Sequence, residues 1–140
     1  MKWYAAHVVM SVSLKSHTQD TFPAWENIVL VAARSQSEAF SRAEDYGRQE
    51  EGDEDGTFVW GGKPACWIFQ GVRKLTECAL LGQRPDDGDE VSFNELEFES
   101  LAAIEKFAAG ESATAKFHDR FRAPKRSKAG VTSKPKRKGA

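Results

Sequence analysis

Alternating apolar and polar positions predict a long, half-buried strand at the start of the chain. Between Lys2 and Leu14 the apolar side chains occupy the even positions, which are Tyr4, Ala6, Val8, Met10, Val12 and Leu14. A second strand is predicted from Trp25 to Ala33, where a nearly continuous apolar run rich in β-branched residues favours a central place in the sheet. The length of the loop between the two strands suits antiparallel pairing.

A helix is predicted directly after the second strand. Ser35-Gln36-Ser37-Glu38 has the form of a capping box, in which the Ser and Glu side chains satisfy free backbone N–H groups. Helical spacing then places one apolar stripe toward the sheet, formed by Ala39, Phe40, Ala43, Tyr46 and Gly47. We expect this helix to end near Gly52.

The next segment predicts a hairpin and one further strand. A short strand at Thr57–Trp60 and a long one from Pro64 to about Cys78 flank the turn pair Gly61-Gly62. Beyond a turn-rich stretch, the residues from Val91 to Phe98 predict a strand. Its apolar positions change parity in the middle, which indicates a bulge near Asn94.

A short helix is predicted to close the folded part. Ser100 is its expected cap, Gly110 its expected end, and Leu101, Ile104 and Phe107 fall at helical spacing. Together the elements predict an α+β fold in the order ββαββ(β)α, with a mainly antiparallel sheet and one longer and one short helix packed on it. Residues 1–118 would form this single domain.

Composition narrows the class of protein. The chain has 140 residues, of which 40% are hydrophobic, enough for one core but not for two. No apolar run approaches the roughly 18 residues that span a bilayer, and no leader sequence is recognisable at the N-terminus. Cys66 and Cys78 lie twelve residues apart along one predicted strand, beyond disulfide reach. Reduced thiols favour a cytoplasmic protein, and the lack of a bilayer-spanning run favours one that makes no membrane contact.

The formal net charge of −1 conceals two opposed parts. Residues 1–118 hold 11 Lys and Arg against 20 Asp and Glu, whereas residues 119–140 hold 9 against 1. The second part has almost no bulky apolar side chain, so we expect a disordered basic tail. Its candidate contacts to nucleic-acid phosphates are Lys125, Arg126, Lys128, Lys134, Lys136, Arg137 and Lys138. Such binding would be independent of base sequence, and a merely solubilising tail is the alternative.

An acidic loop follows the first predicted helix. Glu51, Asp53 and Asp55 match the first, third and fifth positions of a calcium loop. The twelfth position, however, is Gly62 instead of a bidentate Glu. A solvated acidic turn, or a weak water-mediated Mg²⁺ contact, is therefore the favoured interpretation, and we assign no metal site.

Two further features bear on binding and catalysis. The tryptophans serve core packing on the simpler interpretation, but Trp60, close to the acidic loop, could anchor a protein partner with Arg73 as its companion.

Glu77-Cys78 could form a thiol nucleophile with a histidine, although the three histidines are scattered and no catalytic motif appears. A non-catalytic module without a cofactor is favoured over an enzyme.

Several segments resemble a bacterial domain-of-unknown-function family, number forty-two eighty-eight. They are Lys2-Trp3-Tyr4-Ala5-Ala6, Glu26-Asn27-Ile28-Val29-Leu30, Ser37-Glu38-Ala39, Trp67-Ile68-Phe69-Gln70-Gly71-Val72 and Asp89-Glu90-Val91. The resemblance covers residues 2–99 and implies a shared fold, but no activity that could be transferred to particular residues. We therefore expect a small binding or regulatory module that contacts an unidentified protein through Glu51, Asp53, Asp55, Trp60 and Arg73. Nucleic-acid binding by the tail is the second hypothesis, and an uncharacterised enzyme is the third.

Overall fold

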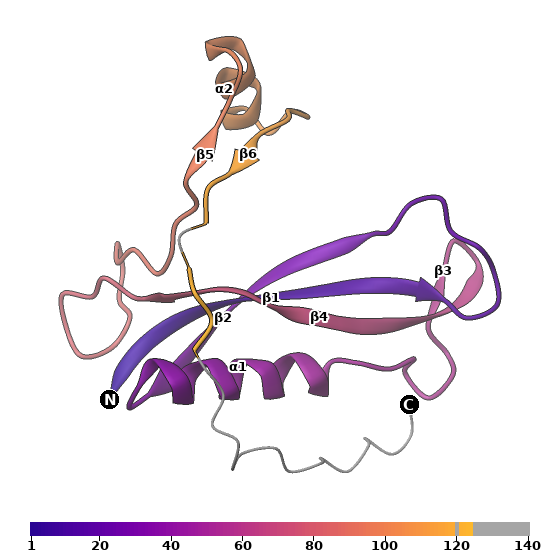
Figure 1. Cartoon of the computed structure of the whole chain (residues 1–140), viewed down its shortest axis with the longest axis horizontal. Coiled ribbons are helices and arrows are strands. Elements are labelled where there is room, and N and C mark those ends of the chain that lie inside the picture. Colours follow the sequence, from indigo (N-terminus) through magenta and orange to yellow (C-terminus); the bar gives the residue numbers. More distant parts are fainter. Residues whose placement is uncertain (120, 125–140) are drawn as a thin grey trace.

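The computed structural model of the protein describes residues 1–119 and 121–124 and has the predicted α+β class (Figure 1). One antiparallel sheet of four strands has the order β2-β1-β4-β3. Its strands are β1 (Lys2–Leu14), β2 (Ala24–Ala33), β3 (Val59–Trp60) and β4 (Lys63–Glu77). Helix α1 (Gln36–Gln49) lies along one face of this sheet. A separate unit is formed by β5 (Leu96–Glu97), α2 (Leu101–Ala108) and β6 (Lys116–Phe117).

Strand β1 occupies the centre of the sheet, and β2 lies at its edge. Strand β1 pairs with β2 on one side and with β4 on the other, both antiparallel. The prediction that the β-branched run of β2 marks a central strand was therefore wrong, although its boundaries were nearly correct. An apolar composition does not report how many neighbours a strand has, and six of the ten residues of β2 are exposed.

Helix α1 packs on the sheet through its smallest residues. Ser35 caps it by accepting a hydrogen bond from the Glu38 N–H at 3.1 Å, as the capping box predicted. The buried residues of the helix are Ala39, Ala43 and Gly47. The predicted stripe was wrong at Tyr46, which is 37% exposed, because small side chains bring the helix close to the sheet and turn larger ones outward.

Strands β3 and β4 form the predicted hairpin. Trp60 is opposite Lys63, and Gly61 and Gly62 between them have φ angles of 57° and 78°. Two successive positive φ angles are the signature of the tight turn that glycine pairs favour. Strand β3 comprises two residues only, so the hairpin covers just the first part of β4.

Two bulges interrupt the pairing of β4 with β1. His7 is opposite Lys74 but Val8 is opposite Val72, so Arg73 is an extra residue on β4. A second shift, between Val9 and Met10, makes Gln70 extra as well. Bulges re-aim the side chains near them, and here the first one directs the consecutive cations Arg73 and Lys74 to contacts on the sheet face opposite α1.

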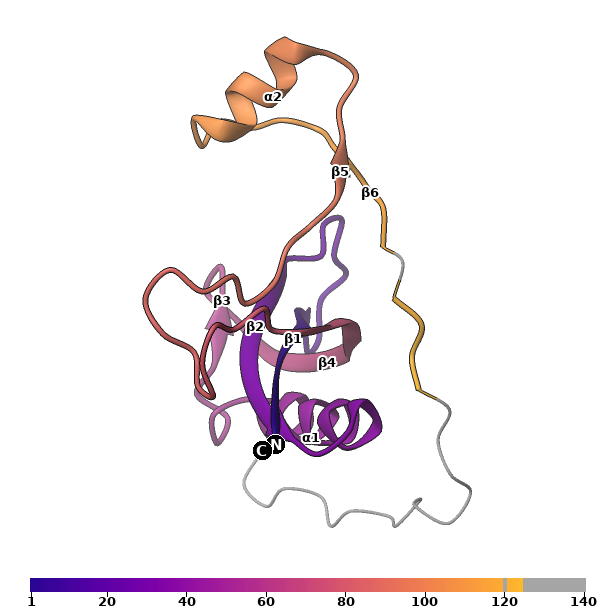
Figure 2. The same cartoon turned by 90° about the vertical axis from the view of Figure 1, so that its left-hand side faces the viewer.

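The segment after Glu77 departs most from the sequence-based expectation. The predicted strand Val91–Phe98 is reduced to the two residues of β5, which pair with β6 and not with the main sheet. We call residues 96–117 the arm. It projects away from the sheet in both views (Figures 1 and 2), and none of the residues of α2 is buried. The expected packing of the short helix on the sheet is thus not observed.

Within the described residues, no helix is long and apolar enough to cross a bilayer. The candidate nucleic-acid contacts from Lys125 to Lys138 lie outside the described residues. Asp119 and Phe121, which the sequence assigned to the tail, contact the body. Asp119 forms an ion pair with Arg73, and the Phe121 ring stacks on Phe40 at a centroid distance of 6.1 Å.

Candidate functional site

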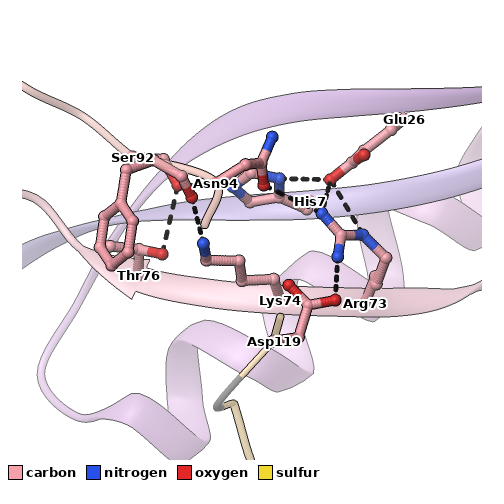
Figure 3. A network of polar contacts seen from close by, with 9 residues as sticks. His7, Glu26, Arg73, Lys74, Thr76, Ser92, Asn94 and Asp119 are labelled. Carbon is pink, nitrogen blue, oxygen red and sulfur yellow. Dashed lines mark hydrogen bonds and ion pairs between the residues drawn. The ribbon is translucent and has the colours of Figure 1, made fainter. Parts of the chain in front are cut away.

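A network of polar side chains lies on the sheet face opposite α1 (Figure 3). We call it the polar network, and its members are His7, Glu26, Arg73, Lys74, Thr76, Ser92, Asn94 and Asp119. His7 is at its centre and is 1% exposed. Its Nδ1 lies 2.5 Å from Glu26 Oε1, and its Nε2 lies 2.5 Å from Ser92 Oγ. Both ring nitrogens are therefore satisfied in a buried position.

The contacts of His7 are part of a longer chain of polar contacts. A carboxylate oxygen only accepts hydrogen bonds, so His7 Nδ1 donates to Glu26. His7 Nε2 and the Ser92 hydroxyl share the second contact, and Ser92 Oγ donates to Thr76 Oγ1 at 3.2 Å. The result is a continuous chain of hydrogen bonds from the sheet edge at Glu26 to β4.

Arg73 provides the charge that balances Glu26. Its Nε and one terminal nitrogen donate to Glu26 Oε1 at 3.1 and 2.5 Å. Burial by itself raises the pKa of Glu26, but the hydrogen bonds from Arg73 and His7 outweigh it and hold that pKa below the ordinary value. Burial likewise lowers the pKa of Arg73, and its bonds to Glu26 and Asp119 more than compensate. Both groups are therefore ionised at neutral pH.

The polar network also fastens both ends of the arm to the sheet. On the incoming side Arg73 donates to Asn94 Oδ1 at 3.1 Å, and Lys74 donates to the Phe93 carbonyl and lies 4.1 Å from the centre of the Phe93 ring. On the outgoing side Arg73 pairs with Asp119 and lies 5.1 Å from the Phe117 ring centre. The chain thus leaves the sheet and returns to it at one charged point.

The contacts from Ser92 to His7 and from His7 to Glu26 have the order of nucleophile, base and acid in a hydrolytic triad. The surroundings favour a structural role instead. The His7 ring is almost completely enclosed, and the nearby cations Arg73 and Lys74 are engaged with Glu26, Asp119 and Phe93. Groups already bonded to protein are poorly placed to stabilise charge on a substrate.

The candidate partner-binding residues do not form one surface. Arg73 belongs to the polar network, whereas Trp60 contacts Trp25, with ring centres 5.5 Å apart. Trp25 in turn packs edge-on against Trp67, which stacks on Phe58. Trp25, Trp60 and Trp67 therefore pack on one another, and Trp25 and Trp60 remain 38% and 39% exposed.

The acidic loop forms a turn in which Asp53 serves the protein itself. Asp53 is 8% exposed, forms an ion pair with Lys15, and accepts the Gly56 N–H at 3.0 Å. The hydrogen bond from Lys15 holds the pKa of Asp53 below its ordinary value. Asp55 is exposed at a φ angle of 58°, and Glu51 is half-buried. Among the described residues, no group of three His, Cys, Asp or Glu side chains converges as metal ligands would.

Cys78 is poorly suited to act as a nucleophile. Burial raises the pKa of its thiol, and the carboxylates of Asp89 and Glu77 raise it further. A reactive cysteine needs the opposite, a thiolate stabilised by positive charge. Cys66 and Cys78 are both free, as predicted.

A family model described as domain of unknown function (DUF4288) matches residues 3–92, more than half of the chain. The chain belongs to this family. The DUF4288 match includes α1 and the four-stranded sheet, apart from Lys2 at the start of β1. Neither the search of curated proteins nor the search of solved structures returned a significant match.

The DUF4288 segment divides the polar network unequally. His7, Glu26, Arg73, Lys74, Thr76 and Ser92 lie inside it. The match ends at Ser92, before the arm and before Asn94 and Asp119. Sequence reasoning found Arg73 but missed His7 and Glu26 as a pair. The available signal was a histidine on the polar side of a half-buried strand, which requires polar partners if it is covered.

Proposed function

We propose that the protein is a non-catalytic binding module that contacts a partner protein through its arm. The observation that carries this proposal is the exposure of the apolar side of α2. Leu101, Ile104 and Phe107 are 70%, 44% and 48% exposed, although they are spaced as the buried stripe of a helix. An eight-residue helix gains little from intrinsic propensity, so such a stripe is best explained by burial against another molecule.

The arm is held in a defined position, which lowers the entropic cost of binding. Leu96 pairs with Phe117 and Glu97 with Lys116, and the His118 N–H donates to the Glu95 carbonyl at 2.9 Å. The polar network attaches the two ends of this ladder to the sheet. A partner therefore meets a helix that is already presented away from the body.

The charge around α2 supports a partner with a basic surface. Residues 95–111 contain five glutamates and one lysine. The complementary surface is an apolar groove with a basic rim, into which α2 inserts Leu101, Ile104 and Phe107. The apolar side of α2 takes the place of the acidic, tryptophan-bearing end as the proposed contact, because the tryptophan rings at that end pack on one another.

Affinity capture from lysate of the source cells with four tagged proteins tests the proposal. Leu101→Ser/Ile104→Ser/Phe107→Ser should lose a partner that the unaltered chain retains, while Val59→Ser, an exposed apolar site on β3, should retain it. The melting temperature of the arm variant should remain close to that of the unaltered chain, since α2 has no buried residue. If Trp60→Ala/Asp55→Asn abolishes capture and the arm variant does not, the acidic end is the contact and the proposal fails.

A nucleophilic enzyme is the second candidate, favoured by the Ser92–His7–Glu26 contacts alone. A fluorophosphonate probe tests it directly, because such probes modify activated serines. The binding proposal expects no labelling of the native protein. Labelling that is lost in Ser92→Ala and in His7→Gln, with both variants still folded, would favour an enzyme instead.

A further inference from the structure

The two edges of the sheet differ in how they are protected. On one side, β3 pairs with only the first two residues of β4, and the rest of that edge is β4 itself, which is interrupted by two bulges and carries Arg73 and Lys74. Strand β2 at the other edge has ten residues, and its register with β1 continues without a shift from Ala24 to Ala33. It contains no Lys or Pro, and its one charged residue, Glu26, is bonded to His7 and Arg73. Natural edge strands usually carry charged side chains, Pro or a bulge to prevent pairing with other chains.

The backbone of β2 presents hydrogen-bonding groups away from the sheet at alternate residues. The Trp3 carbonyl accepts from the Cys78 N–H at 2.9 Å, so the polar groups of Trp3 face the β4 side of β1. Ala32 is opposite Trp3, and its own groups therefore face outward, where Arg42 donates to the Ala32 carbonyl. Antiparallel alternation gives Leu30, Ile28 and Glu26 the same direction. Among the described residues, nothing bonds to the outward groups of Ile28 and Leu30.

The side chains at these positions are also left uncovered. Ile28 and Leu30 lie on the sheet face opposite α1 and are 51% and 43% exposed. Ile28 and Leu30 form an apolar patch beside an open row of backbone groups. An antiparallel strand with apolar side chains at alternate positions would cover this patch and bond to these backbone groups.

We infer that this neighbour is β2 of a second copy of the chain, paired antiparallel about Val29. In this register Ile28 of each copy is opposite Leu30 of the other, and both pairs bring outward-facing backbone groups together. A pairing of identical strands about a two-fold axis requires only that the surface complement itself. Shifting the register by two residues places Leu30 opposite Glu26, or Ile28 opposite Ala32. Neither shifted register then forms the two Ile28–Leu30 pairs.

The dimer would extend one sheet across two copies without using the arm. The polar network stays intact, because Glu26 is directed to His7 and Arg73 on its own sheet. Two arms would then be carried by one assembly. A dimer that presents two binding helices gains avidity toward a partner with repeated sites.

Light scattering of the full chain after size-exclusion chromatography tests the pairing. The unaltered protein should have twice the mass of the 15.6 kDa chain. Ile28→Lys and Leu30→Glu, each at an exposed site, should give folded monomers because each places a charge against an apolar partner. The double variant Ile28→Lys/Leu30→Glu should recover the dimer, since the introduced lysine of one copy then faces the introduced glutamate of the other.

Val59→Lys is the matched control, an exposed apolar residue on the opposite edge, and it should leave the dimer unchanged. Circular dichroism establishes that each variant is folded. A monomeric unaltered chain, a dimer that survives Ile28→Lys, or a folded double variant that stays monomeric would each overturn the Val29-centred pairing. A dimer lost only when Leu101, Ile104 and Phe107 are changed would place the contact on the arm and overturn it as well.

Discussion

A buried histidine needs a hydrogen-bond partner for each ring nitrogen, and the two partners of His7 come from different parts of the chain. Glu26 comes from the neighbouring strand, and Ser92 comes from a segment 85 residues further along the chain. A buried polar group left without its partner costs on the order of 1–3 kcal/mol. The polar network therefore makes the path of the chain over the sheet more specific than apolar contacts alone would.

Glu26 gives this network a dependence on pH. The folded-state pKa of Glu26 is lowered, so its contribution to stability is fully present above the ordinary glutamate pKa and is lost as pH falls through the folded value. At neutral pH, Glu26→Gln should reduce the free energy of unfolding by about 1–3 kcal/mol. Urea titrations at decreasing pH should show this difference shrinking. The control Glu105→Gln, on exposed α2, should show no such trend, and an unchanged Glu26→Gln difference down to acid pH would contradict the assignment.

Gly47 is required by the distance between α1 and β4. A Cβ atom at this position would lie 2.3 Å from the Phe69 ring. In an unhindered helix, Gly→Ala stabilises by about 0.5–1 kcal/mol, whereas overpacking costs about 1–3 kcal/mol. Gly47→Ala should therefore lower the melting temperature. Gly82→Ala, where no atom lies within 4 Å, is the control. A stabilised Gly47→Ala variant would show that the Phe69 ring moves aside freely.

The elements were predictable where local chemistry determines them. The alternating pattern of β1, the Ser35 cap and the Gly61-Gly62 turn are local signals, and the structure has the strand, the cap and the turn, although β1 is buried on both faces from Tyr4 to Val8. The edge position of β2 and the detachment of the arm depend on which elements meet, which no local pattern encodes. The polar network was out of reach for the same reason, since Arg73 faces Glu26 only after a bulge places it there.

In the acidic turn, the carboxylate of Asp53 is already bonded within the protein. Asp53 is bonded to Lys15 and to the Gly56 N–H, and the twelfth position of the would-be calcium loop is Gly62. Calorimetric titration with calcium should therefore show no binding tighter than roughly millimolar. A micromolar isotherm that disappears in Asp53→Asn/Asp55→Asn would show that the turn rearranges around the ion.

Opposed charges are joined in one chain. Residues 125–140 carry seven Lys and Arg and no acidic residue, while residues 1–124 hold 13 Lys and Arg against 21 Asp and Glu. We expect the peptide 125–140 to bind duplex DNA more tightly than the intact protein does, because the acidic body competes for the cations. The logarithm of the affinity should fall with the logarithm of salt concentration with a slope of about −6 if all seven contact phosphate.

Fluorescence anisotropy at several salt concentrations measures both quantities. The control chain should end at Pro124, because Asp119 and Phe121 contact the body and must be kept. This shortened chain should not bind DNA. If it binds as tightly as the full protein, the phosphate contacts lie in the body and the role assigned to the basic segment is wrong.

The two extra residues of β4 constrain how this strand can change in evolution. Trp67 and Phe69 face α1 from odd positions, Val72 from an even one, and Leu75 again from an odd one. Deleting either Gln70 or Arg73 alone would exchange the two faces for all of the strand on one side of the gap. Deleting both would preserve the faces but remove the arginine that anchors the arm. Single-residue gaps in this strand should therefore be rare among relatives, and those that lose both residues should also lack the arm.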